Sequence, residues 1–343
     1  MVNKQTLAAL AVAAGLLSMA SGAQAASGDT LAQVIKRGEL QCGVSDGLPG
    51  FSNPNAKGAW EGMDVDMCRG VAAAVFGDAT KVKYIPLNAK ERFTALQSGE
   101  VDMLARNTTW TMSRDATLGL TFTSTNYYDG QGFLVKKGLG VKSAKELDGA
   151  AVCIQAGTTT ELNLADYFRV LGMKYTPVVF DTSDQTVKGF ESGRCDVLTS
   201  DQSQLYALRI KLSQPDEALV LPEVISKEPL GPVVRQGDDQ WETLVKWTLF
   251  AMVNAEELGV TSKNVDEMKK SNNADVRRLL GLEEPTGSVL GVKADWGYQI
   301  VKQVGNYGEV FERNVGAGSP LKIARGINAL WNQGGFMYAP PIR

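Results

Sequence analysis

The chain has 343 residues, a net charge of −3 and no histidine, and these properties exclude several functions before any motif is considered. A weakly acidic chain offers no basic stripe for nucleic acid. Without imidazole there is no serine nucleophile with a histidine base, and transition metals lose their commonest ligand. We therefore expect no nucleic-acid partner, no metal site and no cofactor, and a chain of this length suits two domains better than one core.

The first 25 residues have the pattern of a secretory signal. Lys4 precedes an apolar run at 7–19, which is too short to span a bilayer, and the residues at 23–25 form an A-x-A cleavage motif. The chain has no lipid-anchor cysteine at the cleavage point. We expect a mature chain from about Ala26 that diffuses freely in the periplasm of a bacterium.

Helices and strands are expected to alternate through most of the chain. In the first half the pattern predicts a helix at 31–37, a strand at 40–44, a helix at 64–76, a strand at 82–86, a helix at 90–98 and a strand at 101–105. In the second half it predicts a strand at 152–155, a helix at 160–171, a strand at 176–180, a helix at 185–192 and a strand at 195–199. Such alternation is typical of parallel sheets covered by helices.

Two apolar stretches flank the second half. We interpret the strand within 130–140 and the strand at 230–235 as the crossovers that enter and leave it. An amphipathic helix at 240–258 then returns the chain to the first half. The long tail after this helix has enough large apolar side chains to pack against a core, namely Trp296, Tyr298, Tyr307, Phe311 and Trp331.

One segment of the chain occurs twice, about ninety positions apart. LQSGEVDMLARN at 96–107 and FESGRCDVLTSD at 190–201 both predict a helix end, a glycine after the helix and a short apolar strand. The first copy ends at Asn107 and the second at Asp201. Ligands of open α/β sheets bind beyond the carboxyl ends of the strands, so a ligand between two such halves would contact both residues.

The four cysteines are informative because the expected compartment is oxidising and their number is even. Cys42 lies in the first predicted strand and Cys68 in the helix after it, whereas Cys153 and Cys195 lie in the second half. The sequence alone allows three pairings. Buried free thiols are the alternative.

Five motifs follow one another between residues 62 and 201. They read GMDVDMCRGVAAAVFG at 62–77, ERFTALQSGEVDMLARNTTWTMSR at 91–114, FTSTNYY at 122–128, QAGTTTE at 155–161 and GRCDVLTSD at 193–201. In this order they resemble the polar amino-acid-binding proteins of bacterial ABC importers. The stretch RNTTWTMSR and the long tail resemble the general branch of that family, which accepts many L-amino acids.

The resemblance implies a two-lobed α/β fold, that of the type II periplasmic binding proteins. Residues 26–135 and 233–343 would form lobe 1, and residues 136–232 would form lobe 2. The implied function is a monomeric receptor without enzymatic activity, which binds L-amino acids of broad specificity between the lobes. Hinge closure would retain the ligand until it is delivered to an inner-membrane ABC permease.

By the same resemblance, five polar residues bind the zwitterion of the ligand. Arg114 takes the α-carboxylate through two parallel hydrogen bonds that a lysine cannot reproduce, helped by Asn107 and Thr109. Thr159 donates to the same carboxylate from the start of a helix, where free N–H groups favour an anion. Asp201 accepts from the α-ammonium. The competing interpretations are a surface ion pair for Arg114 and a helix N-cap for Asp201.

Phe51 corresponds in this family to the aromatic lid over the ligand side chain. The glycines of DGLPGFS depart from the family pattern, so Trp60 or Trp110 would serve as well, and ordinary packing is the alternative for each ring. Asp64 and Asp66 are interpreted as structural, since a carboxylate at a helix N-terminus stabilises the helix dipole.

The alternative function is an exported enzyme on the same fold, such as a cyclohexadienyl or arogenate-type dehydratase. Its chemistry requires a general acid in the cleft. With no histidine in the chain, Glu161, one turn into the helix after QAGTT, is the candidate.

Two further expectations concern the disulfides of a receptor that opens and closes and the pH dependence of its affinity. Disulfides should lie within each half, Cys42–Cys68 and Cys153–Cys195, because a bridge between the halves would lock them. With no histidine, the affinity for a neutral amino acid should vary little between about pH 5 and 8.

Overall fold

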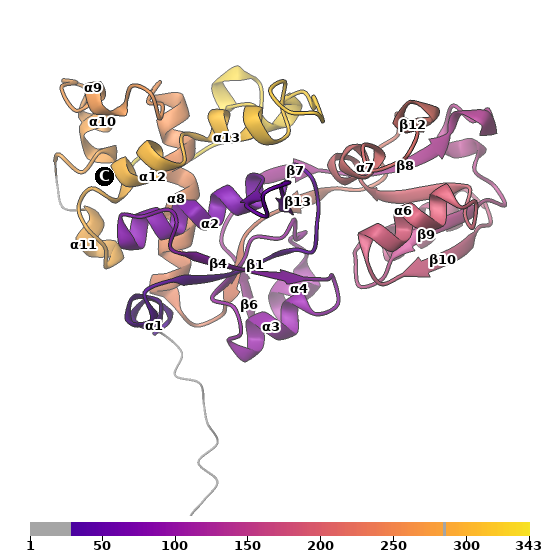
Figure 1. Cartoon of the computed structure of the whole chain (residues 1–343), viewed down its shortest axis with the longest axis horizontal. Helices are drawn as coiled ribbons and strands as arrows, with labels where there is room; N and C mark the ends of the chain where they lie inside the picture. The colour runs from indigo at the N-terminus through magenta and orange to yellow at the C-terminus, as the bar shows by residue number, and fades with distance from the viewer. Residues whose placement is uncertain (1–28, 284–285) are drawn as a thin grey trace, which may run out of the picture.

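The computed structural model describes residues 29–283 and 286–343, so the expected signal segment and its cleavage site lie outside the described residues. Two five-stranded sheets form two lobes, which lie side by side along the long axis of the molecule (Figure 1). Helices cover the strands in both lobes. The two-lobed α/β fold expected from the sequence is confirmed.

Lobe 1 is built on the sheet β4-β1-β5-β14-β6. Its strands are β1 (Leu40–Ser45), β4 (Val82–Leu87), β5 (Met103–Leu104), β6 (Leu120–Phe122) and β14 (Val233–Arg235), with a small hairpin of β2 (Asn53–Pro54) and β3 (Trp60–Glu61). Its first helices are α1 (Thr30–Arg37), α2 (Met63–Phe76), α3 (Arg92–Ser98) and α4 (Met112–Thr117). Strand β1 has parallel neighbours on both sides and is buried along nearly its whole length, as its composition predicts.

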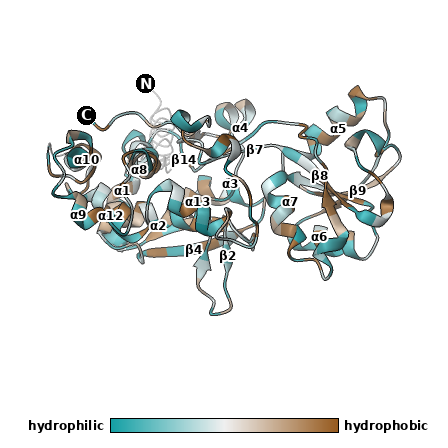
Figure 2. Cartoon of the chain, turned by 90° about the horizontal axis from the view of Figure 1, so that it is seen from above, coloured by the Kyte–Doolittle hydropathy of each residue, from teal (hydrophilic) through white to brown (hydrophobic). Residues whose placement is uncertain are grey.

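Lobe 2 repeats this arrangement in the sheet β10-β9-β11-β8-β12. Its strands are β8 (Gln131–Lys136), β9 (Ala151–Gln155), β10 (Thr176–Phe180), β11 (Val197–Asp201) and β12 (Ala218–Val220). Its helices are α5 (Thr160–Val170), α6 (Ser183–Glu191) and α7 (Gln202–Arg209). Figure 2 shows α5 and α6 on opposite sides of the apolar strands β8 and β9.

The two sheets correspond strand for strand. In each, three parallel strands are followed by an antiparallel one, β14 in lobe 1 and β8 in lobe 2. The repeated segments occupy the same place in both lobes, because α3 leads through Gly99 to β5 and α6 leads through Gly193 to β11. These glycines have φ of 79° and 75°, the left-handed conformation that ends a helix.

The strands that link the lobes differ from those expected. Strand β8 pairs with β11 and β12, so the chain enters lobe 2 before Gln131, earlier than the boundary at 135/136. The stretch 230–235 is divided, and its second part, β14, belongs to lobe 1. The linking strands are instead β7 (Tyr127–Asp129) and β13 (Glu228–Leu230), which pair with each other. An apolar run alone does not distinguish a linking strand from a sheet strand, since only the partner strands decide it.

Both predicted disulfides are present. Cys42–Cys68 joins β1 to α2 within lobe 1, with the Cα atoms 6.2 Å apart. Cys153–Cys195 joins β9 to the turn that precedes β11 within lobe 2, with the Cα atoms 5.6 Å apart. Neither bridge crosses between the lobes, so neither restricts their relative motion.

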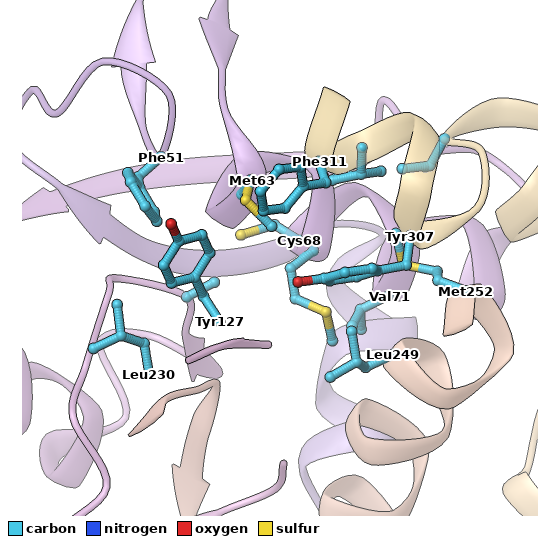
Figure 3. Close-up of a cluster of buried hydrophobic side chains, with 14 of the residues drawn as sticks. Phe51, Met63, Cys68, Val71, Tyr127, Leu230, Leu249, Met252, Tyr307 and Phe311 are labelled. Atoms are coloured by element: carbon cyan, nitrogen blue, oxygen red, sulfur yellow. The ribbon is translucent and has the colours of Figure 1, made fainter. Parts of the chain in front are cut away.

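Helix α8 (Asp239–Glu257) lies against α2 of lobe 1, and the C-terminal tail that follows it packs on the same lobe. The helices of the tail are α9 (Val265–Met268), α10 (Ala274–Leu279), α11 (Thr286–Leu290), α12 (Trp296–Gln303) and α13 (Tyr307–Asn314). Short 3₁₀ helices in the chain are η1 (Lys137–Leu139), η2 (Ala144–Glu146), η3 (Pro215–Glu217), η4 (Gly326–Asn328) and η5 (Trp331–Gln333). Figure 3 shows Tyr307 and Phe311 of the tail beside Met63 and Met252 in one apolar cluster. In the described parts of the chain, no helix has both the length and the hydrophobicity needed to cross a bilayer.

The tail also holds the first linking strand. The Asn328 side chain accepts from Tyr128 N at 2.7 Å and donates to Tyr128 O at 2.9 Å, so it satisfies the free edge of β7. The hydroxyl of Tyr307 donates to Asn126 O at 2.9 Å. The start of this linking strand is therefore fixed to lobe 1.

Candidate functional site

Residues of both lobes meet beyond the carboxyl ends of β5 and β11. Asn107 follows β5, and its side-chain amide donates to Gln204 Oε1 of α7 at 3.1 Å. The hydroxyl oxygens of Thr109 in lobe 1 and Thr159 in lobe 2 lie 3.5 Å apart. The lobes therefore touch across the cleft, and the repeat-end position predicted from the sequence lies at their interface.

The loop after β5 has a special backbone conformation. Asn107 has a φ of 35°, which residues other than glycine rarely adopt. Its N–H donates to Asp64 Oδ2 at 2.9 Å, so Asp64, at the start of α2, fixes the loop. Burial raises the pKa of Asp64 to about 7, against the lowering effects of this hydrogen bond and of Arg106. Asp66 also has a structural role, since it accepts from two side chains of the tail.

Three arginines of lobe 1 lie around this loop, of which Arg92 and Arg106 are buried and Arg114 is half-buried. Arg114, in α4, donates to Thr109 O at 2.9 Å, which turns its guanidinium toward the loop after β5. Arg92 Nε and Arg106 Nη2 are buried without a hydrogen-bond partner among the described residues. Burial lowers the pKa of each guanidinium, and the other two arginines lower that of Arg92 further. Three cations exceed what one α-carboxylate requires.

Three carboxylates oppose these arginines. Asp201 ends β11 and Glu228 begins β13, and both are buried, whereas Asp129, at the end of β7, is half-buried. Burial raises the pKa of Asp201 well above its usual range, the negative charges of Asp129 and Glu228 raise it further, and Arg92 and Arg114 lower it. Burial likewise raises the pKa of Asp129 to about 6. The cleft thus contrasts positive charge from lobe 1 with negative charge from lobe 2 and the linking strands.

Asp201 does not act as a helix cap. It precedes α7, but its side chain makes no capping hydrogen bond. The cap is supplied by Asp129, whose Oδ2 accepts from Ser203 N at 3.2 Å. The carboxylate of Asp201 is therefore free to accept from a cation in the cleft.

Thr159 has a partner that the sequence did not indicate. Its hydroxyl donates to Glu228 Oε2 at 2.9 Å. A hydroxyl has one proton, so in this arrangement the side chain of Thr159 is not a donor toward the cleft. The main-chain N–H groups at the start of α5 have no acceptor within the helix, and they are the donors that this loop offers to an anion.

The aromatic candidates have packing partners. Phe51 is buried and meets Tyr127 of β7 edge-on, with ring centroids 5.5 Å apart (Figure 3). Trp110 stacks on Phe122 at 5.6 Å, whereas Trp60 lies in the hairpin of β2 and β3. Of the three, Phe51 packs directly on a linking strand.

The residue proposed as a general acid is occupied elsewhere. Glu161 Oε2 accepts from Gly157 N at 3.1 Å and so stabilises the loop before α5. Across residues 29–283 and 286–343, no three Cys, Asp or Glu side chains gather in a way that could hold a metal. The groups that the cleft offers to a ligand are therefore the arginines of lobe 1 and the carboxylates of lobe 2 and the linking strands.

Five residues of the candidate site were missed by sequence reasoning, namely Gln204, Arg92, Arg106, Asp129 and Glu228. Gln204 contacts Asn107 across the lobes, Arg92 and Arg106 are buried beside the loop after β5, and Asp129 and Glu228 belong to the linking strands. Arg92 and Arg106 lie inside a motif that was recognised, and their charge was the available signal. Glu228 lies in a stretch without a motif, and no signal marked it.

Comparisons with known proteins identify the family of this chain. The model of the bacterial extracellular solute-binding proteins, family 3, matches residues 40–264. The chain is 66% identical to YhdW of Escherichia coli (strain K12) over 100% of both chains, and the name of that relative assigns it provisionally as an amino-acid ABC transporter-binding protein. It is 61% identical to the general L-amino acid-binding periplasmic protein AapJ of Rhizobium johnstonii, over 97% of this chain and 98% of the relative.

A solved structure is similar to this chain in both fold and sequence. The ABC transporter periplasmic binding protein from Brucella ovis, with glutathione bound, matches with a TM-score of 0.91 at 60% identity, covering 92% of this chain and 99% of that one. The names of these relatives are those of binding proteins rather than enzymes, so the dehydratase alternative is not supported. The chain belongs to the bacterial extracellular solute-binding proteins, family 3.

Proposed function

We propose that this protein is a periplasmic receptor that binds L-amino acids between its lobes and delivers them to an inner-membrane ABC permease. The names of the Rhizobium and Escherichia relatives, which refer to L-amino acid binding and to amino-acid ABC transport, support this function. Export by a signal segment cleaved near Ala25, followed by free diffusion as a monomer without a nucleic-acid partner, completes the proposal.

The observation that carries the proposal is the opposed charge in the cleft. Arg114 and Asp201 come from different lobes and influence each other electrostatically, and both are largely withdrawn from water. A zwitterion between them would supply a carboxylate for the guanidinium and an ammonium for Asp201. Asn107, Thr109 and the main-chain N–H of Thr159 would add donors to the carboxylate.

The positive charge that the α-carboxylate leaves uncompensated indicates the chemical type of the ligand side chain. Arg92 and Arg106 present unpartnered donors beside Arg114. They suit side chains that end in a carboxylate or an amide, and Phe51 would line the apolar part of the pocket. The glutathione in the Brucella structure, an amino-acid derivative with two carboxylates, is consistent with such a site.

Movement of the lobes about β7 and β13 would admit and retain the ligand. Residues 29–126 with 231–343 would move as lobe 1, and residues 131–226 as lobe 2. In the closed arrangement Asp201 and the arginines are desolvated, which is unfavourable unless a ligand compensates their charge. Ligand contacts to both lobes would therefore favour closure.

A thermal-shift screen of the mature protein against the twenty L-amino acids and glutathione tests the function. A ligand at 100 times its Kd stabilises the folded state by about 2.7 kcal/mol. Decarboxylated amines and N-acylated amino acids should give no shift, because each lacks one of the two charges. The proposal fails if no amino acid raises the melting temperature, and a shift produced only by a prephenate-like compound would favour the enzyme instead.

A further inference from the structure

The second linking strand connects the ligand loops of the two lobes. In β13, Pro229 O accepts from Trp110 N of lobe 1 at 2.8 Å. One residue earlier, Glu228 accepts from Thr159 of lobe 2 at 2.9 Å. Two adjacent residues of one short strand therefore set the position of the loop before Arg114 and of the loop before α5.

Glu228 is a buried carboxylate held by neutral donors. It is 1% exposed, and besides Thr159 it accepts from Asn163 Nδ2 and Ser226 Oγ, each at 2.6 Å. Burying a carboxylate without a direct countercharge is costly, so packing alone does not favour this residue here. Its field also reaches the site, because it raises the pKa of Asp201 and favours the charged form of Arg114.

These contacts determine which way the hydroxyl proton of Thr159 points. Thr159 gives its only hydroxyl proton to Glu228, so toward the cleft its oxygen can only accept, and one of its two lone pairs remains beside the contact with Thr109. Thr109 lies 3.5 Å away from this oxygen across the cleft. A cationic donor of the ligand would find an acceptor in Thr159, whereas a ligand carboxylate would be repelled by it.

We propose that Glu228 is a positioning residue for the ligand ammonium. By taking the proton of Thr159 it keeps that hydroxyl an acceptor, so that Thr159 and Asp201 together receive the ammonium. The proposal rests on the proposed receptor function and goes beyond it, because it assigns the Thr159 hydroxyl to the ammonium and leaves the carboxylate to the main-chain N–H groups.

The variant Glu228→Gln tests this assignment. Its carbonyl oxygen can still accept from Asn163 and Ser226, and its amide would then donate to Thr159 and turn the hydroxyl proton toward the cleft. Losing a hydrogen bond to a charged group should weaken the tightest-binding L-amino acid by roughly 10- to 150-fold in calorimetric titration. The 2-hydroxy acid analogue of that ligand, which has no ammonium, should lose little affinity.

Asn163→Ala is the matched control. It removes a donor from the same carboxylate without changing Thr159, so the Kd should stay within about threefold of wild type even if the melting temperature falls. Thr159→Val combined with Glu228→Gln should bind no more weakly than the weaker single variant, because both act on one hydroxyl.

The outcomes separate this proposal from the proposed function. If the wild type binds no L-amino acid, the receptor function itself fails. If the wild type binds and Glu228→Gln keeps its affinity within threefold, or if the two substitutions add, the positioning role is wrong. Should Glu228→Gln not fold, Thr159→Val decides: selective loss of the amino acid relative to its 2-hydroxy analogue supports the role, and equal loss of both overturns it.

Discussion

Replacing Asp201 by asparagine should weaken binding strongly without weakening the fold. The carboxylate is 6% exposed, makes no capping hydrogen bond and lies within the fields of Asp129 and Glu228. Its raised pKa means that this group contributes stability below its unfolded pKa and loses that contribution as the pH rises toward its folded pKa. At pH 7 the neutral asparagine should therefore leave the melting temperature unchanged or higher.

The expected loss of affinity is large. Removing one partner of a buried, hydrogen-bonded charge pair costs about 2–5 kcal/mol. This corresponds to a loss of about 30-fold to several thousand-fold for every L-amino acid, since the ammonium is common to all of them. Calorimetric titration at pH 7 gives the affinity, and thermal unfolding of the ligand-free protein gives the stability.

Asp129→Ala is the control. Asp129 caps α7 through Ser203 N and alanine has no acceptor for this N–H, so the replacement should lower the melting temperature. The affinity should stay unchanged or rise, because Asp201 ionises more easily without this neighbouring carboxylate. Two results would refute the reasoning: an Asp201→Asn protein that binds several amino acids within a factor of about three of wild type, or one that loses as much stability as the control.

Four other predictions concern pH, the arginine, the hinge and the disulfides. Ligand binding should release a proton and strengthen from about pH 5 to 8, because Asp201 has a raised pKa and must ionise to receive an ammonium. This prediction revises the flat pH profile of affinity expected from the sequence. Calorimetry in buffers of different ionisation enthalpy measures the proton release, and its absence would show that the prediction is wrong. Arg114→Lys should lose most of the affinity, since a point charge cannot supply two parallel hydrogen bonds; titration showing wild-type affinity would contradict this. Asn328→Ala should free β7 from the tail and widen the range of lobe separations in ligand-free small-angle scattering, and an unchanged profile would argue against that brace. Reduction of the disulfides should lower the stability of each lobe by roughly 2–4 kcal/mol in denaturant unfolding while ligand affinity persists, and loss of binding without loss of stability would be the opposite result.

Asp64 provides a separate test of burial by pH. Its pKa is raised from 3.8 to about 7, so the stability it contributes at low pH should be lost as the pH rises from about 4 to 7. The free energy of unfolding should fall by on the order of 4 kcal/mol over this window from this group alone. Asp64→Asn should flatten that part of the urea-unfolding profile, and an identical slope in both proteins would contradict the assignment.

The sequence by itself determined the features that local pattern encodes. Helix ends at Gly99 and Gly193, followed by short apolar strands, predicted the duplicated unit, because a left-handed residue after a helix favours glycine wherever the unit lies in space. The resemblance carried by the motifs implied that Arg114 and Asp201 lie in the cleft, and Asp201 also stands at the end of a predicted strand. The disulfide pairs followed from a mechanical argument about moving lobes, and the structure confirms both.

Only the tertiary structure decided the features that depend on contacts between distant segments. Strand β8 joined lobe 2 because β11 and β12 are its partners, and its own sequence resembles that of a linking strand. The proton of Thr159 points to Glu228, a residue 69 positions away along the chain, and the tail reaches Tyr128 through Asn328, 200 positions away. The pKa values of Asp64 and Asp201 depend on how far the surrounding protein excludes water from each carboxyl group, which is a property of tertiary packing and not of either motif.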